Sequence, residues 1–403
     1  MAKDVNPPRG MRDFLPQEKA LRDHILNQIL QTFKRYGFQS IETPALEDLE
    51  RLTSGQGGDN EKLAFRVLKR GEDLDRVLPS AVENPDSLSD LGLRYDLTVP
   101  LTRYYATNHA KLPKVFKAIQ TGPVWRAERP QKGRYRQFIQ CDIDIIGDKS
   151  IAAEAELLIA SLAALDEIGL AEARIRVNHR ELLAQHVIGL GVSAADSASA
   201  MITIDKLDKI AIQGVVRELD EKFGQEVASK AQAWLSGIDA SRVPAALKEL
   251  FDLVGESAPG RLVYDPTLVR GMGYYTGSIF EIEHPESGSS IGGGGRYDGM
   301  VGRWLGTDVP AVGISIGFER AVDLAAALGQ SEPGLVLVYE AEHLSDALRL
   351  QAQAIAEGWV ARLEQRPKNL KLLLETMAGQ GFTHFSLVDR SIGFQDLVIK
   401  VLD

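Results

Sequence analysis

The sequence predicts an α/β protein built from more than one domain, and three stretches of the chain indicate this. Between Gly122 and Gly147 two strand-like runs flank a basic loop, and the second run alternates polar and apolar residues. Residues 184–260 are rich in Ala, Leu, Lys, Asp and Glu and have helical periodicity instead. From Leu335 onward, strand and helix patterns alternate. With 403 residues, the chain is long enough for two or three hydrophobic cores.

Composition excludes several classes of protein. The net charge of −10 argues against a protein that coats nucleic acid without sequence preference. Its single cysteine, Cys141, excludes an intramolecular disulfide, and the seven histidines show no spacing typical of a zinc site. No stretch approaches the ~20 apolar residues of a membrane span. We therefore expect a cytoplasmic protein with no metal centre of its own and no membrane segment.

The stretch from Gly122 to Gly147 is expected to form a β-hairpin that faces a ligand. Val124 to Ala127 would form one strand, and the loop Glu128 to Arg134 carries three cations. The polar face of the second strand consists of Arg136, Phe138, Gln140, Asp142 and Asp144. The alternative is a solvated basic hairpin beside a half-buried strand, because alternation often only separates core from water.

The first half of the chain contains two further patterns. An amphipathic helix from Lys19 to Phe33 precedes a strand, Phe38 to Thr43. Within LGLRYDLTVP, a short strand would place Asp96 and Thr98 on one side, where a carboxylate and a hydroxyl can bind an ammonium group. The alternative is a surface ion pair between Asp96 and Arg94, and the residues alone leave both possibilities open.

The second half contains three runs with chemical character. Leu268 to His284 is a strand-like run led by Arg270. The glycine-rich run Ile291 to Gly302 is not followed by Gly-Lys-Ser/Thr, so it is not a P-loop, and we expect its backbone to lie against a ligand or another strand. Val309 to Ile316 is expected to be a buried strand, and the next helix has Arg320 in its first turn, where a polyphosphate would be attracted.

Together these motifs resemble the histidyl-tRNA synthetase family of class II aminoacyl-tRNA synthetases. The resemblance rests on RAERPQKGRYRQFIQCDIDIIG, LRYDLT, LVRGMGYYTG, GGGGRYDG and PAVGISIGFER, and it extends over nearly the whole chain. RYDLT, GEDL and IDKLDKI are similar to the eukaryote-like branch of the family that some bacteria carry. The resemblance implies an antiparallel catalytic sheet flanked by helices, a helical insertion, and a small C-terminal α/β domain like an anticodon-binding domain.

The implied domain boundaries divide the chain into four segments. Residues 1–183 and 261–327 would form the two parts of the catalytic core, residues 184–260 the insertion, and residues 328–403 a shortened C-terminal domain.

The resemblance also assigns roles to individual residues. Arg270 and Arg126 match the catalytic arginines. The residues that match the ATP site are Arg126, Glu128, Arg134, Phe138 and Arg320. The residues that match the histidine site are Asp96, Thr98, Arg126, Gln140, Asp144, Arg270, Tyr274, Tyr275 and Tyr297. Candidates to contact the tRNA acceptor end are Arg129, Gln131 and Lys132.

The implied reaction has two steps. Histidine and ATP, with Mg2+ accompanying the nucleotide, would give histidyl-adenylate and pyrophosphate, and the histidyl group would then pass to the 3′ end of tRNA(His). The resemblance also implies a homodimer.

Two other functions stay open at this point. One is the histidine-binding regulatory subunit of ATP phosphoribosyltransferase, a non-catalytic relative. Such proteins usually lose the arginines that this chain keeps. The other is a synthetase paralogue with a non-tRNA acceptor, which the shortened C-terminal domain favours. The chain also has Gly273 where the family usually has Asp, next to the YY of RGMGYY.

Overall fold

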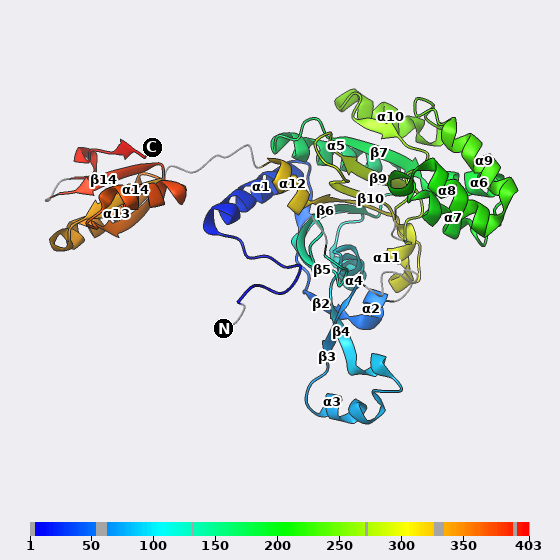
Figure 1. The fold of residues 1–403 in the computed structure, drawn as a ribbon, viewed down its shortest axis with the longest axis horizontal. Helices are drawn as coiled ribbons and strands as arrows, with labels where there is room; N and C mark the ends of the chain where they lie inside the picture. The colour runs from blue at the N-terminus through cyan, green and yellow to red at the C-terminus, as the bar shows by residue number, and fades with distance from the viewer. Residues whose placement is uncertain are drawn as a thin grey trace. The chain divides into compact units, whose positions relative to one another are not determined.

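The structure is a computed structural model, and it describes residues 5–53, 63–130, 133–270, 273–325, 334–389 and 393–402. Contacts divide the chain into two compact units (Figure 1). The first consists of Met1–Arg12 with Ile25–Ala325, and the second of Asp13–His24 with Ala326–Asp403. None of the described helices is long and apolar enough to cross a membrane.

The described residues form both α-helices and β-strands. The helices are α1 (Pro16–Arg35), α2 (Leu49–Thr53), α3 (Glu72–Val77), α4 (Thr98–Asn108), α5 (Ile151–Glu167), α6 (Arg180–Gly189), α7 (Ser197–Ile204), α8 (Leu207–Phe223), α9 (Gln225–Ser236), α10 (Ala245–Ser257), α11 (Asp298–Leu305), α12 (Phe318–Ala325), α13 (Leu344–Ala356) and α14 (Leu370–Gly379). The strands are β1 (Gln39–Ser40), β2 (Leu46–Asp48), β3 (Phe65–Leu68), β4 (Ser89–Leu93), β5 (Phe116–Trp125), β6 (Gln137–Ile146), β7 (Arg174–His179), β8 (Leu262–Tyr264), β9 (Ser278–Glu283), β10 (Gly292–Arg296), β11 (Ala311–Gly317), β12 (Gly334–Tyr339), β13 (Val360–Gln365), β14 (His384–Val388) and β15 (Lys400–Val401).

The first unit is built on an eight-stranded sheet in the order β1-β5-β6-β11-β10-β9-β7-β8. Its central pairs are antiparallel, and only the outermost pairs, β1 with β5 and β7 with β8, are parallel. Helix α5 packs against β6 and β11, and α10 packs against α5. The predicted α/β class, with a large sheet flanked by helices, is confirmed.

The predicted hairpin is present, and its polar face is buried. β5 and β6 pair antiparallel from Trp125 opposite Gln137 to Phe116 opposite Ile146, so the first strand is much longer than Val124 to Ala127. From Gln140 onward every residue of β6 is buried, on both faces. The interpretation as a solvated hairpin beside a half-buried strand is therefore wrong.

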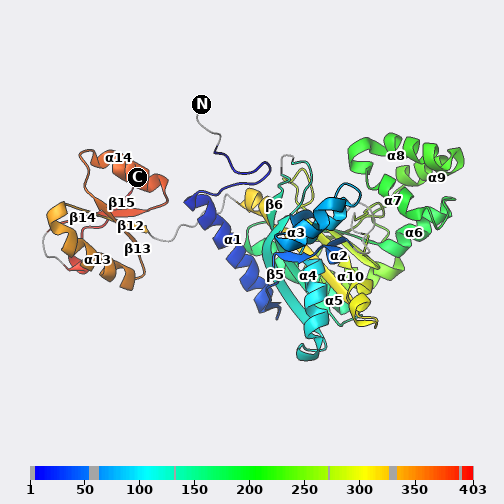
Figure 2. The same cartoon turned by 90° about the horizontal axis from the view of Figure 1, so that it is seen from below.

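Helices α6 to α9 form a group of their own beside the sheet (Figures 1 and 2). Their apolar faces meet in a core that includes Leu183, Val215 and Leu235. The helical periodicity predicted over residues 184–260 runs across a break in the structure, because α7 ends at Ile204 and α8 begins at Leu207. Apolar periodicity continues through this break, so the break is not visible in the pattern.

Three predicted strands differ in extent from those observed. The strand expected from Phe38 to Thr43 pairs only at β1, and the run Leu268 to His284 is a strand only at β9. Asp96 and Thr98 do not lie on a strand: β4 ends at Leu93, and Thr98 is the first residue of α4. A helix start therefore fixes these two residues.

The second unit contains a four-stranded sheet in the order β13-β12-β14-β15. β12 pairs parallel with both β13 and β14, because α13 and α14 provide the crossovers that parallel strands need. The fully buried residues of β12 alternate between two apolar clusters, with Leu335 and Leu337 in one and Val336 and Val338 in the other. The predicted order of strand, helix, strand, helix and strand is confirmed.

Helix α8 contains a strained residue that can be tested. Ala211 has φ 56° and ψ 175°, a conformation that is costly for a residue with a Cβ. Replacing Ala211 with Gly should raise the free energy of unfolding by about 1 kcal/mol, because relief of about 1–3 kcal/mol of strain exceeds the entropic cost of glycine. Urea denaturation measures the change. Ala233→Gly, at an exposed helical position of α9, is the control and should lower stability by about 1 kcal/mol. Equal losses in both variants would contradict the strain.

Candidate active site

One face of the central sheet changes along β6 from an apolar core to a polar floor. Ile146 belongs to a hydrophobic cluster with Phe116 and Ala311, its partners in register on β5 and β11. Asp144 and Asp142 follow at two-residue intervals, so their side chains project from the same face. β11 places Gly313 opposite Asp144 and Ser315 opposite Asp142. The sheet therefore has a polar region next to its apolar core.

Glycines make room for the side chains that lie on this floor. A Cβ built on Gly293 would lie 2.8 Å from the Arg270 guanidinium. On Gly295 it would lie 2.8 Å from the Tyr275 ring, and on Gly313 it would lie 1.9 Å from Asp144 Oδ1. Gly293 and Gly295 belong to β10, so the glycine run is a strand in the middle of the sheet. The side chains of Arg270 and Tyr275 pack directly on the backbone of this strand.

Three buried carboxylic acids line the site. Burial raises the pKa of Asp96 to about 6 and that of Asp144 to about 7. The pKa of Asp142 is raised well above its ordinary value, by burial first and then by the charge of Asp144. The Asp144 carboxylate accepts a hydrogen bond from the Tyr297 hydroxyl at 2.6 Å. These acids favour a bound cation or a hydrogen-bond donor.

Several buried polar atoms in the site have no hydrogen-bond partner in the part of the chain that the structure describes. Among the described residues, such atoms include Asp96 Oδ2, Gln140 Oε1, Asp142 Oδ1 and Arg270 Nε. Buried polar groups are normally hydrogen-bonded, because leaving one unpaired costs about 1–3 kcal/mol. Three acceptors and one guanidinium donor therefore await a ligand that carries both donors and acceptors.

The cations of the site are held by neutral groups as well as by acids. Arg126 Nε donates to the Tyr95 carbonyl at 3.1 Å, and its Cζ lies 5.0 Å from the centre of the Phe138 ring. Arg270 Nη1 donates to Glu281 Oε2 at 2.9 Å.

Tyrosine rings connect the predicted histidine-site residues. The Tyr274 ring packs edge-on against Tyr275 and Tyr297, with centroids 4.7 and 6.2 Å apart. The Tyr274 hydroxyl also hydrogen-bonds Thr98. The predicted histidine-site residues thus lie in one connected cluster.

A second cationic region lies at the start of α12. Arg320 donates to the Ser290 carbonyl, and burial together with the charge of Arg134 lowers the pKa of Arg320. Two guanidinium groups of like charge that lie close enough for one to affect the pKa of the other indicate an anion site. Glu319, the residue before Arg320, accepts hydrogen bonds from the backbone N–H of Ile139 and from Arg12, and so ties α12 to β6.

Some predicted residues lie outside this cluster. The side chains of Glu128 and Arg129 are exposed, and the backbone carbonyl of Glu128 accepts a hydrogen bond from Arg136 Nε at 3.0 Å. Gln131 and Lys132 lie outside the described residues. The suggested ion pair between Arg94 and Asp96 is wrong, because Arg94 instead donates to backbone carbonyls, including that of Thr43 at 2.7 Å.

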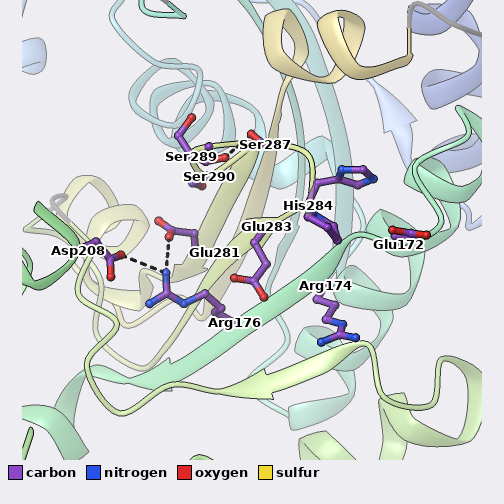
Figure 3. A pocket seen from close by; sticks show the side chains of 12 residues that line it. Glu172, Arg174, Arg176, Asp208, Glu281, Glu283, His284, Ser287, Ser289 and Ser290 are labelled. Carbon is purple, nitrogen blue, oxygen red and sulfur yellow. Dashed lines mark hydrogen bonds and ion pairs between the residues drawn. The ribbon is translucent and has the colours of Figure 1, made fainter. Parts of the chain in front are cut away.

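A cavity of about 410 Å³ lies beside the site, over strands β7 and β9 (Figure 3). Its lining includes Arg174, Arg176, Glu281, Glu283 and Asp208. Glu281, which holds Arg270, is therefore shared between the cavity and the site.

Comparisons with known proteins relate this chain to one family. Residues 10–321 match the family model described as histidyl-tRNA synthetase. A histidine--tRNA ligase of Leifsonia xyli subsp. xyli (strain CTCB07) is 52% identical over 429 aligned residues, covering 100% of this chain and 99% of that protein. A probable histidine--tRNA ligase of Tropheryma whipplei (strain Twist) is 40% identical, covering 98% and 99%.

The chain belongs to the histidyl-tRNA synthetase family.

Solved structures share its fold. The histidyl-tRNA synthetase of Nostoc sp. PCC 7120 superposes with a TM-score of 0.74 at 24% identity, covering 99% of this chain and 97% of that one. A Bacillus halodurans C protein described as an ATP phosphoribosyltransferase regulatory subunit/histidyl-tRNA synthetase gives 0.66 at 22% identity, covering 96% and 97%.

Sequence reasoning missed three residues of this synthetase-family site. Asp142 was visible in the alternation of β6 but received no role. Ser315 belongs to no recognisable sequence motif. It enters the site because β11 pairs with β6, which brings Ser315 Oγ to 3.2 Å from Gln140 Nε2. Glu281 was hidden in a strand-like run, and only its register on β9 brings it to Arg270.

Gly313 tests the glycine floor. Gly313→Ala should lower the free energy of unfolding by about 1–3 kcal/mol, because its Cβ would collide with the Asp144 carboxylate. Thermal denaturation measures the loss. The matched control is Gly299→Ala in α11, where an added Cβ meets nothing within 4 Å and should stabilise by up to about 1 kcal/mol. If Gly313→Ala were as stable as the control, the floor would not be as tight as described.

The raised pKa of Asp144 predicts a pH dependence of stability. The folded-state pKa of Asp144, about 7, exceeds the ordinary 3.8. The contribution of Asp144 to the free energy of unfolding is therefore fully present below pH ~4 and is lost as the pH rises through about 7. Asp144→Asn removes this dependence. The stability of the variant relative to the unsubstituted protein should therefore rise between pH 4 and 8, by at most on the order of 4 kcal/mol.

Urea denaturation of the ligand-free protein across this pH range checks the prediction. Asp308→Asn, at an exposed acid, is the control. The prediction would be contradicted if the difference in free energy of unfolding between Asp144→Asn and the unsubstituted protein stayed constant with pH.

Proposed function

We propose that this chain is a histidine–tRNA ligase that joins histidine to ATP and then transfers the histidyl group to the 3′ end of tRNA(His). The observation that carries the proposal is the set of unpartnered polar atoms between buried acids and the arginines Arg126 and Arg270. A free amino acid is a zwitterion, so it needs an anionic group for its ammonium and a cationic group for its carboxylate. Both kinds of group converge here.

The histidine side of the site would work by hydrogen bonding and charge. Asp96 accepts a backbone N–H from Val99 through Oδ1, which leaves Oδ2 for the substrate ammonium, with Thr98 and Gln140 beside it. Asp144, oriented by Tyr297, would accept an imidazole N–H. An apolar competitor would leave these buried groups unpaired, a penalty that can reach roughly 10⁴- to 10⁵-fold in specificity.

The ATP side would bind the nucleotide through cations and one ring. Phe138, already beneath Arg126, offers a face on which adenine can stack. Arg134 and Arg320 would hold the terminal phosphates, with Glu128 near the base. Mg2+ usually keeps several waters and binds through substrate phosphates with one or two carboxylates, so here we expect ATP to supply most of its ligands.

The chemistry is an in-line displacement at the α-phosphate of ATP. An oxygen of the histidine carboxylate bonds to that phosphorus while the bond to the bridging oxygen breaks and pyrophosphate leaves. Arg126 and Arg270 would stabilise the negative charge that spreads over the phosphoryl oxygens. In the second step, a hydroxyl of the tRNA 3′-terminal ribose attacks the adenylate carbonyl, and AMP leaves.

The remaining assignments complete the proposal. Arg129, Gln131 and Lys132 would contact the tRNA acceptor end. Residues 1–183 and 261–327 would form the catalytic core, 184–260 the insertion, and 328–403 an anticodon-binding-like domain. We further propose a homodimer that works in the cytoplasm.

The two alternatives receive less support. A histidine-binding regulatory subunit does not need four arginines around a nucleotide site, yet Arg126, Arg134, Arg270 and Arg320 are all present. The likeness to the Bacillus halodurans C protein, at 22% identity, concerns the fold alone. A paralogue with another acceptor was favoured by the C-terminal domain, but the 52% identical ligase matches this chain along its entire length.

Two assays test the function in sequence. Histidine-dependent exchange of pyrophosphate into ATP is expected for a ligase or a paralogue and not for a regulatory subunit. Charging of purified tRNA(His) is expected for the ligase alone. A protein that exchanges pyrophosphate but charges no tRNA would be a paralogue, and one that does neither would overturn the proposal.

Two arginines of the hairpin should separate the two steps. Arg126→Ala should reduce pyrophosphate exchange by roughly 10²- to 10³-fold, because a fixed donor to the developing charge is lost. Arg129→Ala, at an exposed loop position, should leave exchange unchanged and raise the KM for tRNA. Steady-state kinetics of both reactions distinguish these outcomes. Equal effects of the two substitutions on exchange would refute the assignment of Arg126.

A further inference from the structure

We propose that Glu281 is a positioning residue for Arg270, and that Arg176 holds Glu281 in place from the opposite side. The proposal rests on the proposed function, in which Arg270 acts on the α-phosphate of ATP. Glu281 and Arg176 line the edge of the cavity over β7 and β9. They would support the reaction without touching the reacting atoms.

The Glu281 carboxylate bridges two arginines through different oxygens. Oε2 accepts from Arg270 Nη1 at 2.9 Å, and Oε1 accepts from Arg176 Nη1 at 3.2 Å. Since both Arg270 and Glu281 have side chains that are about one-fifth exposed, solvent does not fully screen the pair. A carboxylate fixed at both oxygens has little freedom to rotate.

Arg176 is itself held by the framework. It lies opposite Glu281 in the register of β7 and β9, so both side chains project from the same face of the sheet. Arg176 Nε donates to Asp265 Oδ2 at 2.6 Å, and Nη1 lies 3.6 Å from Asp208 Oδ2 at the start of α8. The chain of contacts thus runs from the helical group α6 to α9 through β7 and β9 to Arg270.

Arg270 needs such support because its surroundings provide little of it. It lies outside any helix or strand, and the floor beneath its guanidinium is Gly293, which has no side chain to pack against. Glu281 occupies Nη1, and the buried Nε has no hydrogen-bond partner among the residues that the structure describes. The ion pair therefore fixes the plane of the guanidinium while leaving another donor available to a phosphate oxygen.

Figure 3 shows Arg176 between Asp208 and Glu281 at the cavity, with Glu283 and Arg174 further along the same two strands. Glu283 pairs in register with Arg174, as Glu281 does with Arg176. It is two residues further along β9 and so projects from the same face. Glu283 is therefore a matched control for Glu281, with the same residue type, strand, face and cavity.

The experiment compares the full-length unsubstituted chain with Glu281→Gln, Glu283→Gln and Arg270→Ala in histidine-dependent pyrophosphate exchange. Glu281→Gln should lower kcat by roughly 10- to 100-fold, because small misplacements of a catalytic group can cost about 10² in rate. The KM values for histidine and ATP should change by less than about 3-fold, which general unfolding of the site would not permit. Glu283→Gln should match the unsubstituted chain, and Arg270→Ala should lose exchange.

A second variant covers the case in which Glu281→Gln does not fold. Arg176→Ala removes the outer support, and the cavity of about 410 Å³ gives guanidinium ion access to the vacated position. Exchange by Arg176→Ala should be low and should recover at least 5-fold on addition of millimolar guanidinium chloride, with saturation, whereas the unsubstituted chain should not respond. An equal concentration of sodium chloride controls for ionic strength.

The outcomes separate this proposal from the proposed function. No exchange by the unsubstituted chain overturns the proposed function, and the positioning role with it. If Arg270→Ala loses exchange but folded Glu281→Gln retains the kcat of Glu283→Gln, only the positioning role is overturned. Where Glu281→Gln does not fold, failure of guanidinium to restore Arg176→Ala overturns it as well.

Discussion

The candidate site depends on the burial of acids that form no ion pair with any cation in the described part of the chain. Asp142 and Asp144 lie two residues apart on one face of β6 and are at most 4% exposed, so desolvation disfavours the ionised form of each. The charge of Asp144 adds to this for Asp142, and the charge of Asp96 adds to it for Asp144. An isolated buried carboxylate is costly, and the chain responds by raising the pKa of these groups, to about 7 for Asp144. A ligand with an ammonium group and imidazole N–H donors would supply the missing partners.

The glycines are the steric counterpart of this electrostatic arrangement. Gly293 and Gly313 carry no side chains, so Arg270 and the Asp144 carboxylate can lie directly on the sheet. Any larger residue would lift these groups towards the ligand and close the site. The strand β10 is weak by β-propensity, because glycine packs nothing, and its antiparallel pairing with strands on both sides compensates for this.

Features that depend on local sequence pattern were predictable, whereas features that depend on the register between strands were not. The alternation around Asp142 and Asp144 identified the strand and its polar face, and the order of elements after Leu335 was correct because each has its own periodicity. Asp96 and Thr98 were recognised as a pair, but a strand was expected where a helix begins. Glu281 and Ser315 could not be found, because their roles arise from pairing between strands far apart in the sequence.

A site for a zwitterion must also keep its own opposite charges apart. If Arg126 or Arg270 paired directly with Asp96 or Asp144, the two groups would neutralise each other and neither would be available to substrate. The chain avoids this by giving Arg270 a different acid, Glu281, and by giving Arg126 a backbone carbonyl and an aromatic face. Tyr274 and Tyr275 lie within the influence of both charges: burial chiefly raises the pKa of Tyr275, which Arg270 lowers and Asp96 raises. Glu281 therefore pairs with the charge of Arg270 away from the acids, which under the proposed function would leave those acids for the amine and the ring of the amino acid.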